Sequence, residues 1–192
     1  MLETVRWITA AGKVLAGDEE GVQLFPGKLR IIDQTKLPQE LVYLELDDIA
    51  EIVDAIKRLS VRGAPAIGCA AALGLAAAAQ HLQNPTSFEQ KGERLAEKLE
   101  ASRPTAVNLF WALDRCRKVL NAGLGVEDLL REGLTILEED IRMCQSIGKH
   151  GAPLVEEGFG ILTHCNAGAL ATGDFGTALS PMYVAHSAGR KF

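Results

Sequence analysis

The spacing of apolar residues changes along the chain, from a β-like beginning to a helical remainder. In residues 1–46, short apolar runs alternate with turn residues such as Ala11-Gly12 and Pro26-Gly27. This alternation is typical of short strands joined by tight turns. We therefore expect a small antiparallel β unit, with strands at residues 5–8, 22–25, 29–33 and 42–46.

From residue 47 onward, apolar positions recur at helical spacing. The pattern predicts a first helix to about residue 60, capped by Asp47 or Asp48, and then a buried alanine-rich helix over residues 64–79. A turn at Asn84–Pro85 and a capping box at Thr86 precede the next helix. Further helices are predicted for residues 87–100, from residue 104, and for residues 126–147, 152–157 and 177–188.

Two of the predicted helix starts carry an arginine shortly before a proline. Arg62 and Gly63 stand just before Pro65, and Arg103 stands directly before Pro104 at the first helical position. Glycine permits an unusual backbone angle, and proline suits the first turn of a helix. Free N–H groups at a helix start attract anions, so the two arginines could converge on one phosphate. Taken alone, however, the short motif at Arg62 favours a plain loop with a surface arginine.

The segment 158–168, GFGILTHCNAG, is an apolar run that ends in polar residues. Its apolar part, residues 159–162, predicts a buried strand. Cys165 follows that strand, in the position where ligands collect beyond the carboxyl ends of parallel strands. Free cysteine is also one of the most commonly buried residues. The residues alone therefore leave open whether Cys165 has a chemical role or a packing role.

Composition and charge narrow the classes of protein to consider. The chain has 192 residues, of which 47% are hydrophobic, and a net charge of −5 that is scattered rather than clustered. This balance argues against nucleic acid as a partner. The N-terminus lacks the apolar core of a signal peptide, and the longest apolar run is too short to span a bilayer, so we expect a cytoplasmic protein with no membrane partner. The four cysteines form no Cys-x-x-Cys pair, which argues against a zinc site or a redox dithiol.

Four long motifs carry a resemblance to a known family. In chain order they are IIDQTKLPQELVYLEL, SVRGAPAIGCAAALGLA, SRPTAVNLFWALDR and SIGKHGAPLVEEGFGILTHCNAGALATGDFGTAL. Over nearly the whole chain, the sequence resembles the methylthioribose-1-phosphate isomerase family. That family belongs to a superfamily with the regulatory subunits of translation initiation factor 2B and the ribose-1,5-bisphosphate isomerases.

The resemblance implies an α/β fold in two parts. Residues 1–150 would form an N-terminal β-plus-helical domain, and residues 151–192 would form the first β–α portion of an incomplete Rossmann-like domain. It implies that Arg62, Gly63, Ala64 and Arg103 bind the substrate phosphate and that Cys165 is catalytic. It also implies a dimeric aldose–ketose isomerase of methionine salvage, which interconverts 5-methylthioribose 1-phosphate and 5-methylthioribulose 1-phosphate with no metal or organic cofactor.

One departure from the family is large. A single strand at residues 159–162 would leave its N–H and C=O groups unpaired, and the family's second catalytic residue, an aspartate further along, has no counterpart here. Asp174 does not match that motif. We therefore expect residues 1–192 alone to be inactive, with the rest of the domain either on a second chain or missing from a truncated gene product. The alternatives are a regulatory or scaffolding subunit and a ribose-1,5-bisphosphate isomerase.

Overall fold

The N-terminal part of the chain forms a four-stranded antiparallel sheet. The computed structural model describes residues 2–82 and 87–192. Its strands are β1 (Val5–Thr9), β2 (Val14–Leu15), β3 (Gly27–Ile32) and β4 (Tyr43–Leu46), in the order β2-β1-β3-β4. Trp7 lies at the centre of the sheet, between Leu15 of β2 and Leu29 of β3. The predicted antiparallel β unit is confirmed.

The strand predicted at residues 22–25 is wrong. This segment is irregular, and β2 pairs with β1 instead. The indole N–H of Trp7 donates to the Leu24 carbonyl at 3.0 Å, and the Phe25 ring packs edge-on against Trp7 with 5.6 Å between ring centroids. The segment therefore folds over the Trp7 side chain rather than extending along the sheet.

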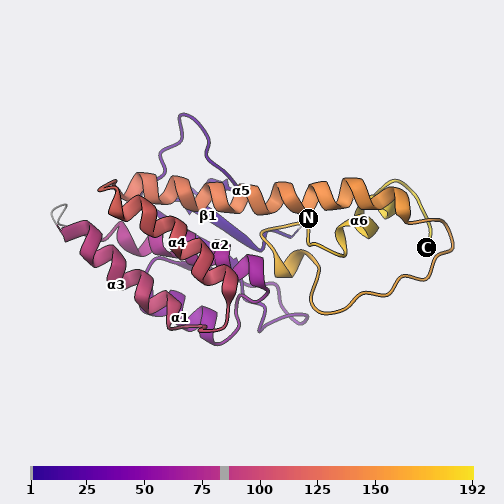
Figure 1. Ribbon diagram of the computed structural model, residues 1–192, viewed down its shortest axis with the longest axis horizontal. Helices are drawn as coiled ribbons and strands as arrows, with labels where there is room; N and C mark the ends of the chain where they lie inside the picture. The colour runs from indigo at the N-terminus through magenta and orange to yellow at the C-terminus, as the bar shows by residue number, and fades with distance from the viewer. Residues whose placement is uncertain (1, 83–86) are drawn as a thin grey trace.

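Six helices follow the sheet in the described residues (Figure 1). They are α1 (Ile49–Lys57), α2 (Ala64–Ala79), α3 (Phe88–Glu100), α4 (Val107–Asn121), α5 (Val126–Gly151) and α6 (Ser180–Ser187), with short 3-10 turns η2 (Ala152–Leu154) and η3 (Ala169–Ala171). The predicted alanine-rich helix is confirmed as α2. It packs against α1, α3, α4, α5 and the sheet, and residues 66–79 are buried, as expected for a helix that is apolar all round. None of the helices in the described part of the chain combines the length and apolarity needed to span a bilayer.

The helix predicted over residues 126–147 ends later than expected, because α5 continues to Gly151. Gly148 and Gly151 do not end the helix early; they allow another helix to pack closely against it. A Cβ at Gly148 would come within 2.4 Å of Ser180 Oγ, and a Cβ at Gly151 within 2.5 Å of Pro181 Cγ. The two glycines thus let α6 lie against the end of α5.

Other helix boundaries shift from their predicted places. Asp48, rather than Asp47, caps α1, and its carboxylate accepts from the backbone N–H groups of Ala50 and Glu51. Helix α4 begins at Val107, because Pro104 lies in a preceding turn. The predicted helix at 152–157 is only the turn η2, and the last helix begins at residue 180 instead of 177. The predicted turn at 84–85 and the cap at residue 86 lie outside the described residues.

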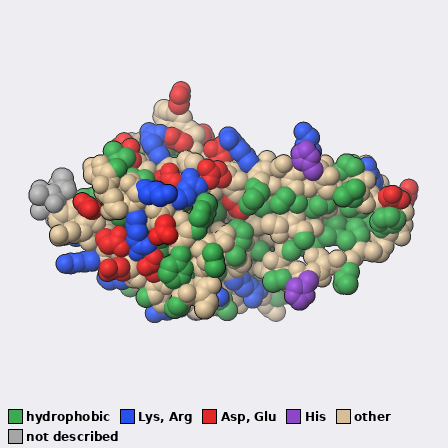
Figure 2. All heavy atoms as spheres, viewed as in Figure 1, with side chains coloured by type: hydrophobic (Ala, Val, Ile, Leu, Met, Phe, Trp, Pro, Cys, Tyr) green, Lys and Arg blue, Asp and Glu red, His purple; other side chains and the backbone are tan. Residues whose placement is uncertain are grey.

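The buried strand predicted at residues 159–162 is also wrong. Residues 158–166 are irregular and exposed, and Leu162 keeps 97% of its surface. A strand needs a neighbour to pair with, and the only sheet in the described residues is the N-terminal one. The chain instead turns back after the end of α5 and runs below α6, in the view of Figure 1, as an extended loop. Figure 2 shows hydrophobic side chains gathered on this half of the molecule, whereas charged side chains gather over α3 and α4.

Candidate functional site

The Arg62-Gly63-Ala64 motif forms the beginning of α2. Gly63 is the residue before the helix and has a φ of 97°, so the predicted unusual backbone angle is confirmed. Pro65 lies in the first turn, where its missing N–H removes no helical hydrogen bond. A Cβ on Gly63 would lie 2.4 Å from Ala171 Cα. The glycine therefore allows the start of α2 to touch the loop that follows Cys165.

Cys165 lies at the surface in a strained conformation. Its φ is 67°, in the left-handed region that residues with a Cβ rarely adopt. Such outliers persist where the surrounding structure enforces them, and they concentrate at functional sites. Residues 167–169, which follow it, are buried, and Thr177 N–H donates to the Ala167 carbonyl at 2.9 Å. The loop is thus closed on itself just beyond the cysteine.

Arg62 and Cys165 both line one pocket of about 550 Å³. This volume lies in the range of small-molecule sites. The structure brings Arg62, Gly63, Ala64 and Cys165 together, although they come from distant parts of the sequence. The pocket is lined by Arg62, Gly63, Ala64, Pro65, Cys165, Asn166, Leu170, Ala171, Thr172 and Thr177.

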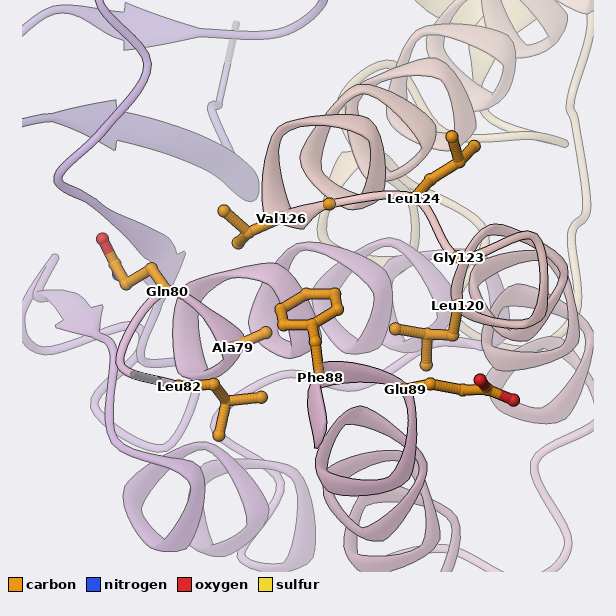
Figure 3. A pocket seen from close by; sticks show the side chains of 10 residues that line it. Ala79, Gln80, Leu82, Phe88, Glu89, Leu120, Gly123, Leu124 and Val126 are labelled. Carbon is orange, nitrogen blue, oxygen red and sulfur yellow. The ribbon is translucent and has the colours of Figure 1, made fainter. Parts of the chain in front are cut away.

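A separate pocket of about 370 Å³ lies among the ends of α2, α3, α4 and α5 (Figure 3). Phe88 points into it from the start of α3, with Leu120 and Leu124 nearby. None of the predicted site residues lines it. We therefore assign the candidate site to the pocket that holds Cys165.

Arg103 does not line the Cys165 pocket. It lies in the turn between α3 and α4, where its carbonyl accepts from the Ala106 N–H at 3.0 Å. Its Nη1 atom is buried and has no hydrogen-bond partner in the described part of the chain. The predicted convergence of Arg103 with Arg62 on one phosphate stays a prediction.

Sequence reasoning missed Gln34, which lies between the two parts of the site. Its side-chain Nε2 donates to the Leu170 carbonyl at 2.7 Å, and its Oε1 accepts from Arg62 Nε at 3.2 Å. Gln34 is only 2% exposed. The available sequence signal was the polar run Asp33-Gln34-Thr35 directly after the buried strand β3.

The neighbouring Asp33 fixes the segment that leads to Arg62. Its Oδ1 accepts from Ser60 Oγ at 2.9 Å and from both the hydroxyl and the N–H of Thr35. Burial alone would raise the pKa of this carboxyl, but these hydrogen bonds and the nearby Arg58 guanidinium outweigh burial and lower the pKa below its usual 3.8. Asp33 is therefore a charged anchor at neutral pH.

A second missed group clamps the far end of the Cys165 loop. Arg6 Nη1 donates to the Gly173 carbonyl at 2.8 Å, and its Nη2 pairs with Asp174 at 2.7 Å. Asp140 of α5 accepts from the Gly173 N–H at 2.6 Å. Burial raises the pKa of Asp140, although the Gly173 hydrogen bond acts in the opposite direction. Gly173 is thus held from both sides, by the sheet and by α5.

The other three cysteines differ from Cys165 in exposure. Cys69, Cys116 and Cys144 are buried, whereas Cys165 is exposed, and all four are free thiols. Burial raises the pKa of Cys116 to about 12 and that of Cys144 to about 11. Because the thiolate is the nucleophile, these two buried cysteines are chemically quiet. Cys165 is the thiol that a bound molecule can reach.

Relatives that match this chain are named as sugar-phosphate isomerases. The methylthioribose-1-phosphate isomerase of Geotalea daltonii is 45% identical over 171 residues, which are 85% of this chain and 49% of the relative. The 5-deoxyribose 1-phosphate isomerase of Petrotoga mobilis is 48% identical over 176 residues, 86% of this chain and 50% of the relative. The chain spans about half the length of these curated relatives.

Two solved structures share the fold. The 5-methylthioribose 1-phosphate isomerase of Pyrococcus horikoshii superposes with a TM-score of 0.79 at 38% identity, covering 85% of this chain and 48% of that one. The translation initiation factor eIF-2B subunit delta from A. fulgidus gives a TM-score of 0.75 at 40% identity, covering 85% and 50%.

Fold and pocket define an α/β protein in which the start of a buried helix and an exposed cysteine share a cavity of small-molecule size. Residues 60–192 match the initiation factor 2 subunit family. The chain belongs to that family.

Proposed function

We propose that this chain provides the phosphate-binding and cysteine-bearing part of an aldose–ketose isomerase that acts on 5-methylthioribose 1-phosphate. The observation that carries the proposal is the single pocket lined by both Arg62 and Cys165. An arginine beside a helix start suits a phosphate dianion, because charged hydrogen bonds and the helix dipole act in the same direction. The names of the isomerase relatives support the reaction class.

The reaction moves hydrogen within one molecule. Ring opening breaks the bond between C1 and the ring oxygen; the oxygen keeps the electron pair and takes up a proton to become the C4 hydroxyl, and C1, which keeps the phosphate, is left as an oxocarbenium carbon. The hydrogen on C2 then moves to C1, and the C2 hydroxyl loses its proton to become the ketone. Cys165 could carry a proton between C2 and C1 through an enol. In the alternative route, a hydride passes directly from C2 to C1 while Cys165 stabilises charge.

Binding tests the phosphate site directly. We expect calorimetry to show that the 192-residue chain binds 5-methylthioribose 1-phosphate but not methylthioribose, which lacks the phosphate. Arg62→Met should weaken binding roughly 10- to 150-fold, the loss of a charged hydrogen bond worth ~1.5–3 kcal/mol. Arg142→Met is the matched control, because Arg142 lies on the exposed face of α5 and pairs with Glu138. Binding that is indifferent to the phosphate or to Arg62 would overturn the proposal.

Turnover tests the role of Cys165. A fusion that joins residues 1–192 to the C-terminal half of the Geotalea daltonii relative should convert 5-methylthioribose 1-phosphate, and Cys165→Ser should retain binding but lose turnover. 5-Deoxyribose 1-phosphate and ribose 1,5-bisphosphate serve as competing substrates. A folded fusion that binds the sugar phosphate without converting it would instead favour a regulatory role, as the eIF-2B relative suggests.

The proposal includes an associated protein surface. Phe159, Ile161 and Leu162 are exposed together on the loop before Cys165. We propose that this apolar segment packs against the remainder of a Rossmann-like domain, in a cytoplasmic dimer of the kind the resemblance implies. Native and denaturing mass spectrometry of the purified material should reveal the second component. A monomer at all concentrations, with nothing bound, would contradict this part.

A further inference from the structure

Gln34 connects the arginine side of the pocket to the cysteine side. Its carboxamide accepts from Arg62 Nε at 3.2 Å and donates to the Leu170 carbonyl at 2.7 Å. Leu170 belongs to η3, on the loop that carries Cys165. Because one planar amide holds both partners, the guanidinium of Arg62 is fixed relative to that loop.

The backbone around Gln34 restrains the same junction. Gln34 N–H donates to the Ser60 carbonyl at 2.9 Å, and Asp33 accepts from the Ser60 hydroxyl at 2.9 Å. Ser60 lies two residues before Arg62. The Gln34 side chain is buried, so it has little freedom to release one partner and bind another. Both the main chain before Arg62 and its side chain are therefore held from the end of β3.

Arg62 itself is exposed, and a free arginine side chain has many rotamers. A guanidinium held at Nε presents its two remaining nitrogens in a fixed direction, since the group is planar. We propose that Gln34 is a positioning residue that orients Arg62 toward the phosphate of the bound sugar. This inference rests on the proposed phosphate site and adds the group that sets its geometry.

A double-mutant cycle separates positioning from a merely structural role. We expect Gln34→Met to weaken binding of 5-methylthioribose 1-phosphate about 5- to 10-fold, the scale of one hydrogen bond. In an Arg62→Met background the same change should have no further effect, because Gln34 acts through Arg62. If the Gln34 effect is the same in both backgrounds, the inference is wrong.

Gln80 provides the matched control. It is also a glutamine bonded at both ends of its amide, to the Gly27 N–H and to the Gly27 and Ala77 carbonyls, but it lies away from the Cys165 pocket. Gln80→Met removes a number of hydrogen bonds comparable to that removed by Gln34→Met. The affinity for 5-methylthioribose 1-phosphate should nevertheless stay within about twofold of the wild-type value. Gln34→Asn keeps a buried amide, but the shorter side chain cannot reach both partners. If Gln34→Met unfolds the protein, the affinity of Gln34→Asn for the sugar phosphate is the test.

The outcomes distinguish this inference from the proposed function. If Arg62→Met leaves affinity unchanged, the phosphate site is wrong and the inference falls with it. If Arg62→Met weakens binding but Gln34→Met and Gln34→Asn do not, the phosphate site stands and only the role of Gln34 is refuted.

Discussion

Replacing Gly63 by alanine tests whether the start of α2 and the Cys165 loop are in contact in solution. The added Cβ would lie 2.4 Å from Ala171 Cα and 2.6 Å from its carbonyl oxygen, both of them backbone atoms that cannot rotate away. Gly63 also has a φ of 97°, which disfavours any residue with a Cβ. The substitution therefore strains the backbone and separates the two halves of the pocket.

Two effects of Gly63→Ala lower the free energy of unfolding: the strained backbone angle and the steric overlap of the added Cβ. A left-handed backbone angle costs roughly 1–2 kcal/mol for an L-residue, and overpacking in a tight contact typically costs about 1–3 kcal/mol. We expect Gly63→Ala to lower the free energy of unfolding by ~2–5 kcal/mol in urea titrations. Gly12→Ala is the control, because Gly12 has a φ of 79° but no atom within 4 Å of a Cβ. The control should lose only the first of the two costs.

The comparison between the two variants is decisive. If Gly63→Ala and Gly12→Ala lose equal stability, residues 165–177 do not pack against the start of α2. The shared pocket of Arg62 and Cys165 would then not exist in solution. A larger loss for Gly63→Ala supports the contact independently of any catalytic assay.

Three further predictions use other features of the fold. Iodoacetamide should modify only the Cys165 thiol in the native chain and all four cysteine thiols in urea. Intact mass counts the modified thiols. A second cysteine that reacts rapidly in the native chain would contradict the burial of the other three. Asp33→Asn should lower the free energy of unfolding by ~1–3 kcal/mol at pH 7. Because the folded pKa of Asp33 is below 3.8, the wild-type protein is the more stable of the two above about pH 4, and this difference is lost as the pH falls through the folded pKa. The free energies of unfolding from urea titrations of the two proteins should therefore converge in acid. Arg6→Met leaves the Asp174 carboxylate without its partner, at an expected cost of ~3–5 kcal/mol. Exposed Arg142→Met should change unfolding by less than about 1 kcal/mol, and equal losses in the two arginine variants would refute the buried clamp.

Local signals in the sequence predicted the parts of the fold that local physics decides. Gly63 before Pro65 predicted both the unusual backbone angle and the helix start. Glycine widens the range of backbone angles and proline fixes φ, and neither effect depends on distant parts of the chain. The alanine-rich run predicted a buried helix for the same kind of reason. Local sequence therefore predicts most of the elements from β3 to α5.

Features that depend on distant partners could not be predicted in this way. The apolar run at residues 159–162 has the composition of a buried strand, but strand formation needs a neighbour that local sequence does not supply. Gln34 and Arg6 resemble ordinary polar residues near a sheet, and their roles depend on carbonyl groups more than 130 residues away in the chain. Composition contains no information about which carbonyl a side chain will reach.

The links between the first strand and the Cys165 loop determine when the site can form. Thr4 and Arg6 bind Ala169, Gly173 and Asp174, which are separated from them by 165 to 168 positions in the chain. Contacts between residues so far apart in the chain form late in folding. The intervening segment loses conformational entropy before the new hydrogen bonds compensate for that loss. During synthesis Thr4 and Arg6 can therefore reach these partners only after residues 169–174 have left the ribosome. The pocket is a product of the finished fold, and ligand binding should appear only in the last phase of refolding.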